Sequence, residues 1–191
     1  RSLSGLSLPA QARLGSGKKA IKGEGQLLFT HFGLSGPLIL NLSRFVTGEM
    51  TLELNLLPQA RREDLWQDSS LTIGQRLDEL LPRRLNRQLL QLVEIDPAAR
   101  NLAGLKLQTL SELIFALPLT VVGTKPLKQA MVTRGGVDLR EVNPKTMESK
   151  ICPGLYFAGE ILDLDGISGG YNLTAAFATG YTAGRAAAKG G

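Results

Sequence analysis

The chain has 191 residues, of which 43% are hydrophobic and 20% are charged, and its formal net charge is +5. This composition predicts a globular protein with one sizeable core or two small ones. No apolar run is long enough to span a bilayer and no leader-like start is present, so we expect no membrane partner. The single cysteine, Cys152, excludes an internal disulfide and fits a cytoplasmic location.

Residues 3–58 alternate short apolar stretches with glycines, which is typical of the strands of a small barrel or sheet. Strands are expected at residues 6–8, 26–30 and 50–57. Between them, Ser35-Gly36-Pro37 predicts the start of a helix, because proline is favoured in a first helical turn.

Residues 59–118 change to helical spacing of leucines, interrupted by Pro82 and Pro97, and a last helix is expected to end at Pro118. The charged faces of this block have no catalytic spacing, which favours a packing role. Strands are expected again at residues 119–122 and 130–133.

Five arginines cluster in the helical block: Arg61, Arg62, Arg83, Arg84 and Arg87. A positive charge permits binding to polyanions. Aromatic residues make up only 5% of the chain and no nucleic-acid-binding module is recognisable, so the sequence disfavours a nucleic acid as partner.

The most informative segment is an apolar run from Gly154 that stops at Gly159-Glu160. It predicts a buried strand whose carboxyl end brings an acid to a ligand crevice. A glycine-rich loop follows and opens a helix near Tyr171. Its backbone N–H groups suit a phosphate, a carbonyl oxygen or an anionic ring, which indicates a nucleotide-cofactor site. The alternative is a tight turn before an alanine-rich helix packed on a sheet.

Three blocks of sequence carry a family resemblance. Residues 154–184 resemble, almost position for position, the C-terminal signature of the BaiN-like (YhiN-type) NAD(P)/FAD-dependent oxidoreductases. Residues 29–37 are similar to the family's F-T-H-x-G-x-S-G-P block. Residues 133–150 are similar to its T-x-G-G-V, E-V and T-M-E-S-K block.

The resemblance implies an α+β fragment with two parts. Residues 1–131 would form a β-rich, barrel-like insert domain, made of residues 1–58 and 119–131 with a helical subdomain at residues 59–118. Residues 132–191 would form the C-terminal strand and helix of a two-dinucleotide-binding-domain FAD fold.

The chain has no G-x-G-x-x-G turn for the pyrophosphate. We therefore expect a C-terminal half whose partner is the missing N-terminal FAD-binding half. The fragment alone should be inactive, and its exposed interface should favour self-association.

The resemblance also implies the cofactor contacts. FAD would be bound by eight residues: Gly135, Gly136, Gly159, Glu160, Gly170, Tyr171, Asn172 and Leu173. The last four begin a helix whose N–H groups would stabilise reduced flavin. NAD(P)H is the expected electron donor and an unidentified small organic molecule the substrate. Glu160 could instead cap a local backbone group, and Asp163 and Asp165 could be turn residues.

His31 and Arg134 are the candidate catalytic residues. His31 is the only histidine and titrates near neutrality, so it could donate a proton or orient the substrate; the alternative is a structural role in a loop. Arg134 could clamp a substrate carboxylate or phosphate, or pair at a surface. Cys152 reads as structural, and no metal site is expected. The alternative function is an autonomous interaction or nucleic-acid-binding module without redox activity.

Overall fold

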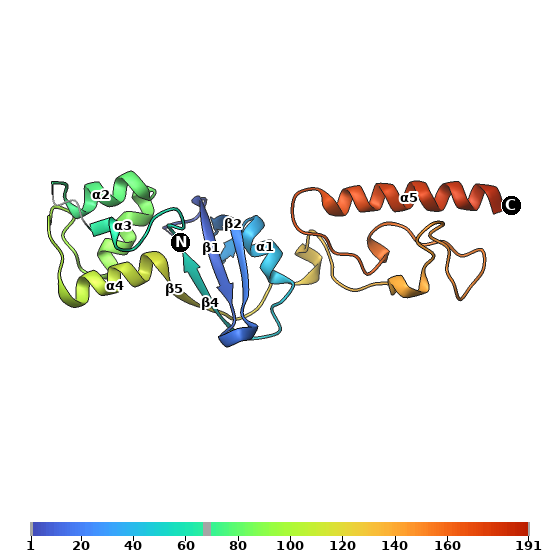
Figure 1. Ribbon diagram of the computed structural model, residues 1–191, viewed down its shortest axis with the longest axis horizontal. Helices are drawn as coiled ribbons and strands as arrows, with labels where there is room; N and C mark the ends of the chain where they lie inside the picture. The colour runs from blue at the N-terminus through green and yellow to red at the C-terminus, as the bar shows by residue number, and fades with distance from the viewer. Residues whose placement is uncertain (1, 67–69, 191) are drawn as a thin grey trace. The chain divides into compact units, whose positions relative to one another are not determined.

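A computed structural model describes residues 2–66 and 70–190 (Figure 1). The chain divides into two compact units, with the boundary between Gly123 and Thr124. The first unit contains a sheet, a helix packed on it and a group of three helices. The second contains a long C-terminal helix and irregular chain. This architecture confirms the expected α+β class with a barrel-like sheet, a helical subdomain and a C-terminal helix.

The sheet of the first unit is a curled, fully antiparallel half-barrel with strand order β3-β2-β1-β4-β5. Its strands are β1 (Ser7–Leu14), β2 (Ile21–Phe29), β3 (Leu34–Ser35), β4 (Met50–Asn55) and β5 (Leu117–Val121). Along β1, Leu8, Ala10, Ala12 and Leu14 are buried and alternate with polar or exposed residues. One face of the sheet therefore packs on the core and the other faces solvent.

Helix α1 (Pro37–Ser43) covers the buried face, where β2 carries glycines instead of side chains. A Cβ atom on Gly23 would lie 3.2 Å from Leu38 Cδ1, so the helix packs directly on the strand backbone. The helix starts with proline in its first turn, as the sequence predicts. Gly36 precedes it with φ +91°, and a Cβ there would lie 2.6 Å from the Gln26 carbonyl oxygen. Only glycine fits this approach.

Three helices form the inserted block: α2 (Ile73–Leu80), α3 (Arg83–Leu92) and α4 (Gly104–Phe115). A capping box begins α2, since Thr72 Oγ1 accepts from the Gln75 N–H at 3.2 Å and Gln75 Oε1 accepts from the Thr72 N–H at 3.0 Å. Asn86 of α3 is 2% exposed and donates to the Gly74 carbonyl and to Asp78, which ties α3 to α2.

Two predicted boundaries are wrong. The last helix ends at Phe115, and Pro118 lies within β5, where it pairs with Glu53. A proline is tolerated there because β5 is the edge strand of the sheet. The strand expected at residues 130–133 does not form. A short 3-10 turn, Leu127–Gln129, is followed by irregular chain, because no neighbouring strand offers it a hydrogen-bonding edge within the described residues.

The second unit is built around α5 (Tyr171–Gly190) and has few buried side chains. The buried strand expected from Gly154 is instead extended chain with a single bridge, Glu148 to Tyr156, and Leu155 is exposed. A strand requires a neighbour along its whole length, and residues 124–190 of this unit offer only isolated bridges. Among residues 2–66 and 70–190, no helix is both long enough and apolar enough to cross a membrane.

Candidate functional site

Two motif segments of the second unit cross at Val137. Its N–H donates to the Ile161 carbonyl at 2.8 Å, and its carbonyl accepts from the Asp163 N–H at 3.0 Å. Leu162, between these partners, is only 3% exposed. The crossing joins the Thr-Arg-Gly-Gly-Val segment to the segment that contains Gly159 and Glu160, so two of the three motif blocks meet here.

Gly136 permits this crossing. A Cβ atom there would overlap the Ile161 carbonyl oxygen and would lie 2.8 Å from the Asp163 nitrogen. The neighbouring Gly135 has φ +102° but open space around its Cβ position, and its N–H donates to Asp163 Oδ1 at 3.1 Å. Gly136 is thus required by packing and Gly135 by backbone conformation.

Glu160 is held by a local contact. Its Oε1 accepts from the Thr133 N–H at 2.8 Å and from Thr133 Oγ1 at 3.1 Å. The sequence left open whether this carboxylate caps a local group or contacts a cofactor, and it does the former here. A cofactor role for Glu160 stays a prediction.

Gly159 lies against the C-terminal helix. It has φ +75°, and its N–H donates to Thr179 Oγ1 on α5 at 3.0 Å. A side chain at this position would require an unfavourable left-handed conformation. The end of the Gly154 segment is therefore fixed to the helix that carries the remaining candidate residues.

The glycine loop is closed by Asn172. Its side chain accepts from the Gly166 N–H at 2.7 Å and donates to the Gly166 carbonyl at 3.1 Å. Gly169 and Gly170 have φ +127° and +89°, and α5 follows with the Thr174 N–H bonded to the Gly170 carbonyl at 3.0 Å. The Asn172 side chain is thus occupied with the loop, and the backbone N–H groups of the helix start are the remaining candidate donors to a ligand.

The first turn of α5 has backbone N–H groups that the helix itself does not satisfy. The N–H groups of Tyr171, Asn172 and Leu173 precede the first bond of the helix and have no acceptor within it. Tyr171 and Leu173 are 60% and 67% exposed, so this end of the helix is accessible. The positive end of the helix dipole adds to these donors and suits an electron-rich ring edge or an anion.

The two candidate catalytic residues lie in different units. His31 is exposed in the loop between β2 and β3, where its ring meets that of Phe32 edge-on at 5.1 Å. The loop is closed by Thr30, whose N–H and Oγ1 both donate to the Gly33 carbonyl. Arg134 is exposed beside Gly135 in the second unit. The structure describes each residue within its own unit, and their catalytic roles stay predictions.

No group of three or more potential metal ligands occurs within residues 2–66 and 70–190. Cys152 is exposed and unpaired with any other cysteine. The candidate site is therefore a set of backbone donors and glycines around the crossing and the start of α5.

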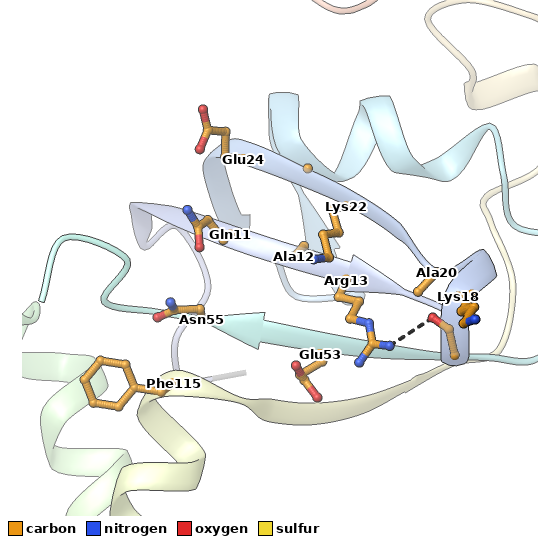
Figure 2. A pocket seen from close by; sticks show the side chains of 12 residues that line it. Gln11, Ala12, Arg13, Lys18, Ala20, Lys22, Glu24, Glu53, Asn55 and Phe115 are labelled. Atoms are coloured by element: carbon orange, nitrogen blue, oxygen red, sulfur yellow. Dashed lines mark hydrogen bonds between the residues drawn. The ribbon is translucent and has the colours of Figure 1, made fainter. Parts of the chain in front are cut away.

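Sequence reasoning missed a groove of about 910 Å³ on the solvent face of the sheet (Figure 2). Its side chains come from β1, β2, β4, the β1–β2 turn and the end of α4: Gln11, Arg13, Lys18, Lys22, Glu24, Glu53, Asn55 and Phe115. The signal was available, because polar residues alternate with apolar residues or glycines along all three strands. A strand of three residues, as the sequence predicts for β1, is too short to show this alternation, whereas the observed strand has eight residues.

Residues 1–132 match a family model described as the HI0933-like protein barrel and H2TH domain. This defines the first unit as a barrel with an inserted helical domain. The chain belongs to the HI0933-like family, and the resemblance to the BaiN-like flavoproteins is confirmed.

Curated relatives of the chain carry two different names. It is similar to the ribosomal RNA dihydrouridine synthase of Haemophilus influenzae, with 36% identity over 185 residues that cover 94% of this chain and 45% of the relative. The protein of the same name from Escherichia coli is 35% identical over 161 residues, covering 81% of this chain and 40% of the relative.

A third relative is the 3-dehydro-bile acid delta(4,6)-reductase of Clostridium scindens, 35% identical over 181 residues, which cover 86% of this chain and 44% of the relative. The chain thus spans less than half the length of each of these three relatives.

Proposed function

We propose that this chain is the C-terminal part of an FAD-dependent oxidoreductase that reduces a carbon–carbon double bond conjugated to a carbonyl group. The names of the relatives support this reaction class. Dihydrouridine is uridine with its ring double bond saturated, and a delta(4,6)-reductase acts on double bonds of a 3-oxo compound. Reduction of a double bond conjugated to a carbonyl adds a hydride to an electron-poor carbon of the conjugated system and a proton to the carbon that gains the negative charge.

The single observation that carries the proposal is the convergence of two family motifs at Val137, next to the segment fixed to α5 through Gly159. Gly169 and Gly170 have positive φ and lead directly into the exposed first turn of α5. Backbone N–H donors without intervening side chains suit the electron-rich N1–C2 carbonyl edge of a flavin, so the donor set fits FAD. FAD, when bound, supplies the hydride, and NAD(P)H is the proposed source of its electrons.

The residues of this chain would orient the cofactor and handle the proton. The N–H groups of Tyr171, Asn172 and Leu173 would stabilise negative charge at the helix start. His31 is the proposed proton donor, because its imidazole is exposed and imidazole is the side chain that most often transfers protons in enzymes. Arg134 is the proposed partner for a carbonyl oxygen or phosphate of the substrate.

The remainder of the parent protein is the proposed partner of the second unit. Leu173, Phe177 and Tyr181 follow one another at intervals of four residues on α5 and are 67%, 76% and 66% exposed. Helical residues at this spacing form one apolar stripe. We expect the stripe to be covered in the full-length protein and to cause self-association of the isolated chain, which Phe177→Asp should reduce in sedimentation measurements.

The test is the visible spectrum of the full-length protein. It should show flavin absorbance, and NADH or NADPH should bleach that absorbance without oxygen. A full-length protein that stays colourless after FAD is added would exclude the proposal. The isolated chain should be colourless and inactive, since it has no G-x-G-x-x-G turn for the pyrophosphate. Tight FAD binding by the isolated chain would contradict that expectation.

The second candidate function is an interaction or nucleic-acid-binding module without redox activity. The groove on the sheet favours it, because the groove lies wholly within the first unit and combines cations with an aromatic ring. The two functions are compatible when the reduced double bond belongs to a base of an RNA.

A further inference from the structure

The solvent face of the sheet carries two rows of polar side chains. In the first row, Arg13 of β1 lies between Lys22 of β2 and Glu53 of β4. In the second row, two residues further along each strand, Gln11 lies between Glu24 and Asn55. Residues two apart on a strand are separated by about 7 Å, so the rows form neighbouring steps of one surface.

The cations gather at one end of the groove. Lys18 lies in the turn between β1 and β2, next to the row that contains Arg13 and Lys22, and both lysines are exposed. Arg13 Nη2 donates to the Gly17 carbonyl at 3.1 Å, and its Nε is buried without a hydrogen-bond partner among the described residues. Figure 2 shows Arg13 and Lys18 together at this end. The Arg13 guanidinium is therefore positioned by the backbone, and its other Nη N–H groups can donate to an anion.

An aromatic ring closes the opposite end. Phe115 is half-buried at the end of α4, and the Arg62 guanidinium carbon lies 5.6 Å from its ring centroid. Figure 2 places Phe115 beyond Asn55, away from Lys18. Both the ring and the guanidinium are planar groups on which a nucleobase stacks. The amides of Gln11 and Asn55 lie between the two ends and can donate and accept hydrogen bonds.

We propose that this groove binds single-stranded RNA. Lys18, Lys22 and Arg13 contact phosphates, and Phe115 with Arg62 stacks a base. Proteins that bind single-stranded nucleic acids combine a positively charged groove, which contacts the phosphates, with aromatic rings on which the bases stack. This inference rests on the proposed function, because it supplies the contact surface that a reductase of an RNA base needs. It revises the sequence-based argument against nucleic acid, which relied on the low overall content of aromatic residues.

Two carboxylates on the same face oppose a polyanion. Glu24 is exposed at the edge of the groove, and no ion pair joins Glu53 to Arg13 in the described part of the chain. Each carboxylate repels a phosphate placed beside the neighbouring cation. Removing the charge of Glu24 should therefore strengthen RNA binding, whereas removing the charge of a groove lysine should weaken it.

The experiment measures the anisotropy of fluorescein-labelled oligouridine titrated with the 191-residue chain at several salt concentrations. The double variant Lys18→Gln/Lys22→Gln should bind the oligouridine several-fold more weakly. The slope of log K against log salt concentration should also become shallower by about 1.4, because each lost phosphate contact contributes about 0.7 to that slope. The matched control is Lys128→Gln/Lys145→Gln, which removes the same charge from exposed positions of the second unit. It should bind as the unsubstituted chain does.

Phe115→Leu separates stacking from charge. It should weaken binding about tenfold, within the range for loss of one base stacked on an aromatic ring, and leave the salt slope unchanged. Glu24→Gln should strengthen binding. Circular dichroism and thermal unfolding of each variant identify any loss that comes from misfolding.

The proposal would be overturned if the groove variant Lys18→Gln/Lys22→Gln and the control variant Lys128→Gln/Lys145→Gln weakened RNA binding equally. It would also be overturned if neither the groove variant nor Phe115→Leu changed RNA binding. Binding of NADPH in place of oligouridine with the same lysine dependence would also overturn it. The flavin spectrum of the full-length parent is a separate readout. If the full-length protein shows flavin absorbance but does not bind oligouridine, only the proposed RNA groove is contradicted. If the full-length protein lacks flavin absorbance but binds oligouridine, only the proposed redox function is contradicted.

Discussion

The substitution Gly136→Ala tests whether the crossing of the two motif segments positions the cofactor. A Cβ at this position would overlap the Ile161 carbonyl oxygen and would lie 2.8 Å from the Asp163 nitrogen. Both obstructing atoms belong to the backbone, so they cannot rotate away as a flexible side chain would. The segment from Ile161 to Asp163 has to move away from Val137.

The cost of this movement follows from the bonds that it breaks. Val137 exchanges one hydrogen bond with Ile161 and one with Asp163, at 2.8 and 3.0 Å. A typical hydrogen bond contributes about 0.5–1.5 kcal/mol net, so their loss together with residual overlap should lower local stability by about 2–4 kcal/mol. The matched control is Gly135→Ala, whose added Cβ meets open space. It should cost only the strain of φ +102°, about 1–2 kcal/mol.

The assay has two parts. Amide hydrogen exchange on the isolated chain should show protection at Val137 and Asp163 falling by about 30-fold or more in Gly136→Ala, because each 1.4 kcal/mol is a factor of ten. In the full-length protein, the same variant should bind FAD more weakly than Gly135→Ala does. Equal FAD affinity in the two variants, with protection lost only in Gly136→Ala, would refute the idea that the crossing positions the cofactor.

Two further outcomes are expected. Gly36→Ala should lower the stability of the first unit, measured by urea unfolding, by about 2–4 kcal/mol, because the new Cβ would approach the Gln26 carbonyl oxygen at 2.6 Å. The control Gly33→Ala places its Cβ in open space and should cost about 1 kcal/mol. Equal losses of stability in the two variants would contradict this reasoning. The side-chain hydrogen bond from Arg140 lowers the pKa of Asp138 from 3.8 to about 2. The stabilising effect of this exposed pair is therefore present above the ordinary pKa of the carboxyl group and is lost as the pH falls from about 4 to about 2. Arg140→Gln should return the pKa of Asp138 toward 3.8 in an NMR titration, and an unchanged value would contradict the assignment of the cause.

Local signals predicted the elements that depend on local chemistry. The start of α1 was predicted from Pro37, and the leucine-rich helical block was predicted from its spacing. Strand β1 was expected to be too short, because Pro9, Ala10 and Ala12 have weak strand preference. Pairing with β2 on one side and β4 on the other outweighs that preference and extends β1 to Leu14.

The opposite error occurred in the second unit. Met131 and Val132 have strand-like side chains, and so do Leu155 to Phe157, but neither segment forms a strand. Strand formation depends on a neighbouring edge as much as on propensity, and single bridges are all that the described residues of this unit supply. The contact between Glu160 and Thr133 was equally inaccessible to sequence reasoning, because it joins residues 27 positions apart.

The polar side chains of the candidate cofactor site largely satisfy one another. Glu160 accepts from Thr133, Asp163 accepts from Gly135, and Asn172 bonds both backbone groups of Gly166. These contacts use side chains to fix the loops, and the N–H groups at the start of α5, which have no acceptor within the helix, are the proposed donors to the cofactor. We therefore expect Asn172→Ala to weaken FAD binding in the full-length protein through disorder of the glycine loop. Asn172→Asp, which keeps the acceptor for the Gly166 N–H, should retain more of that affinity; equal loss in both variants would mean that the amide contacts the cofactor itself.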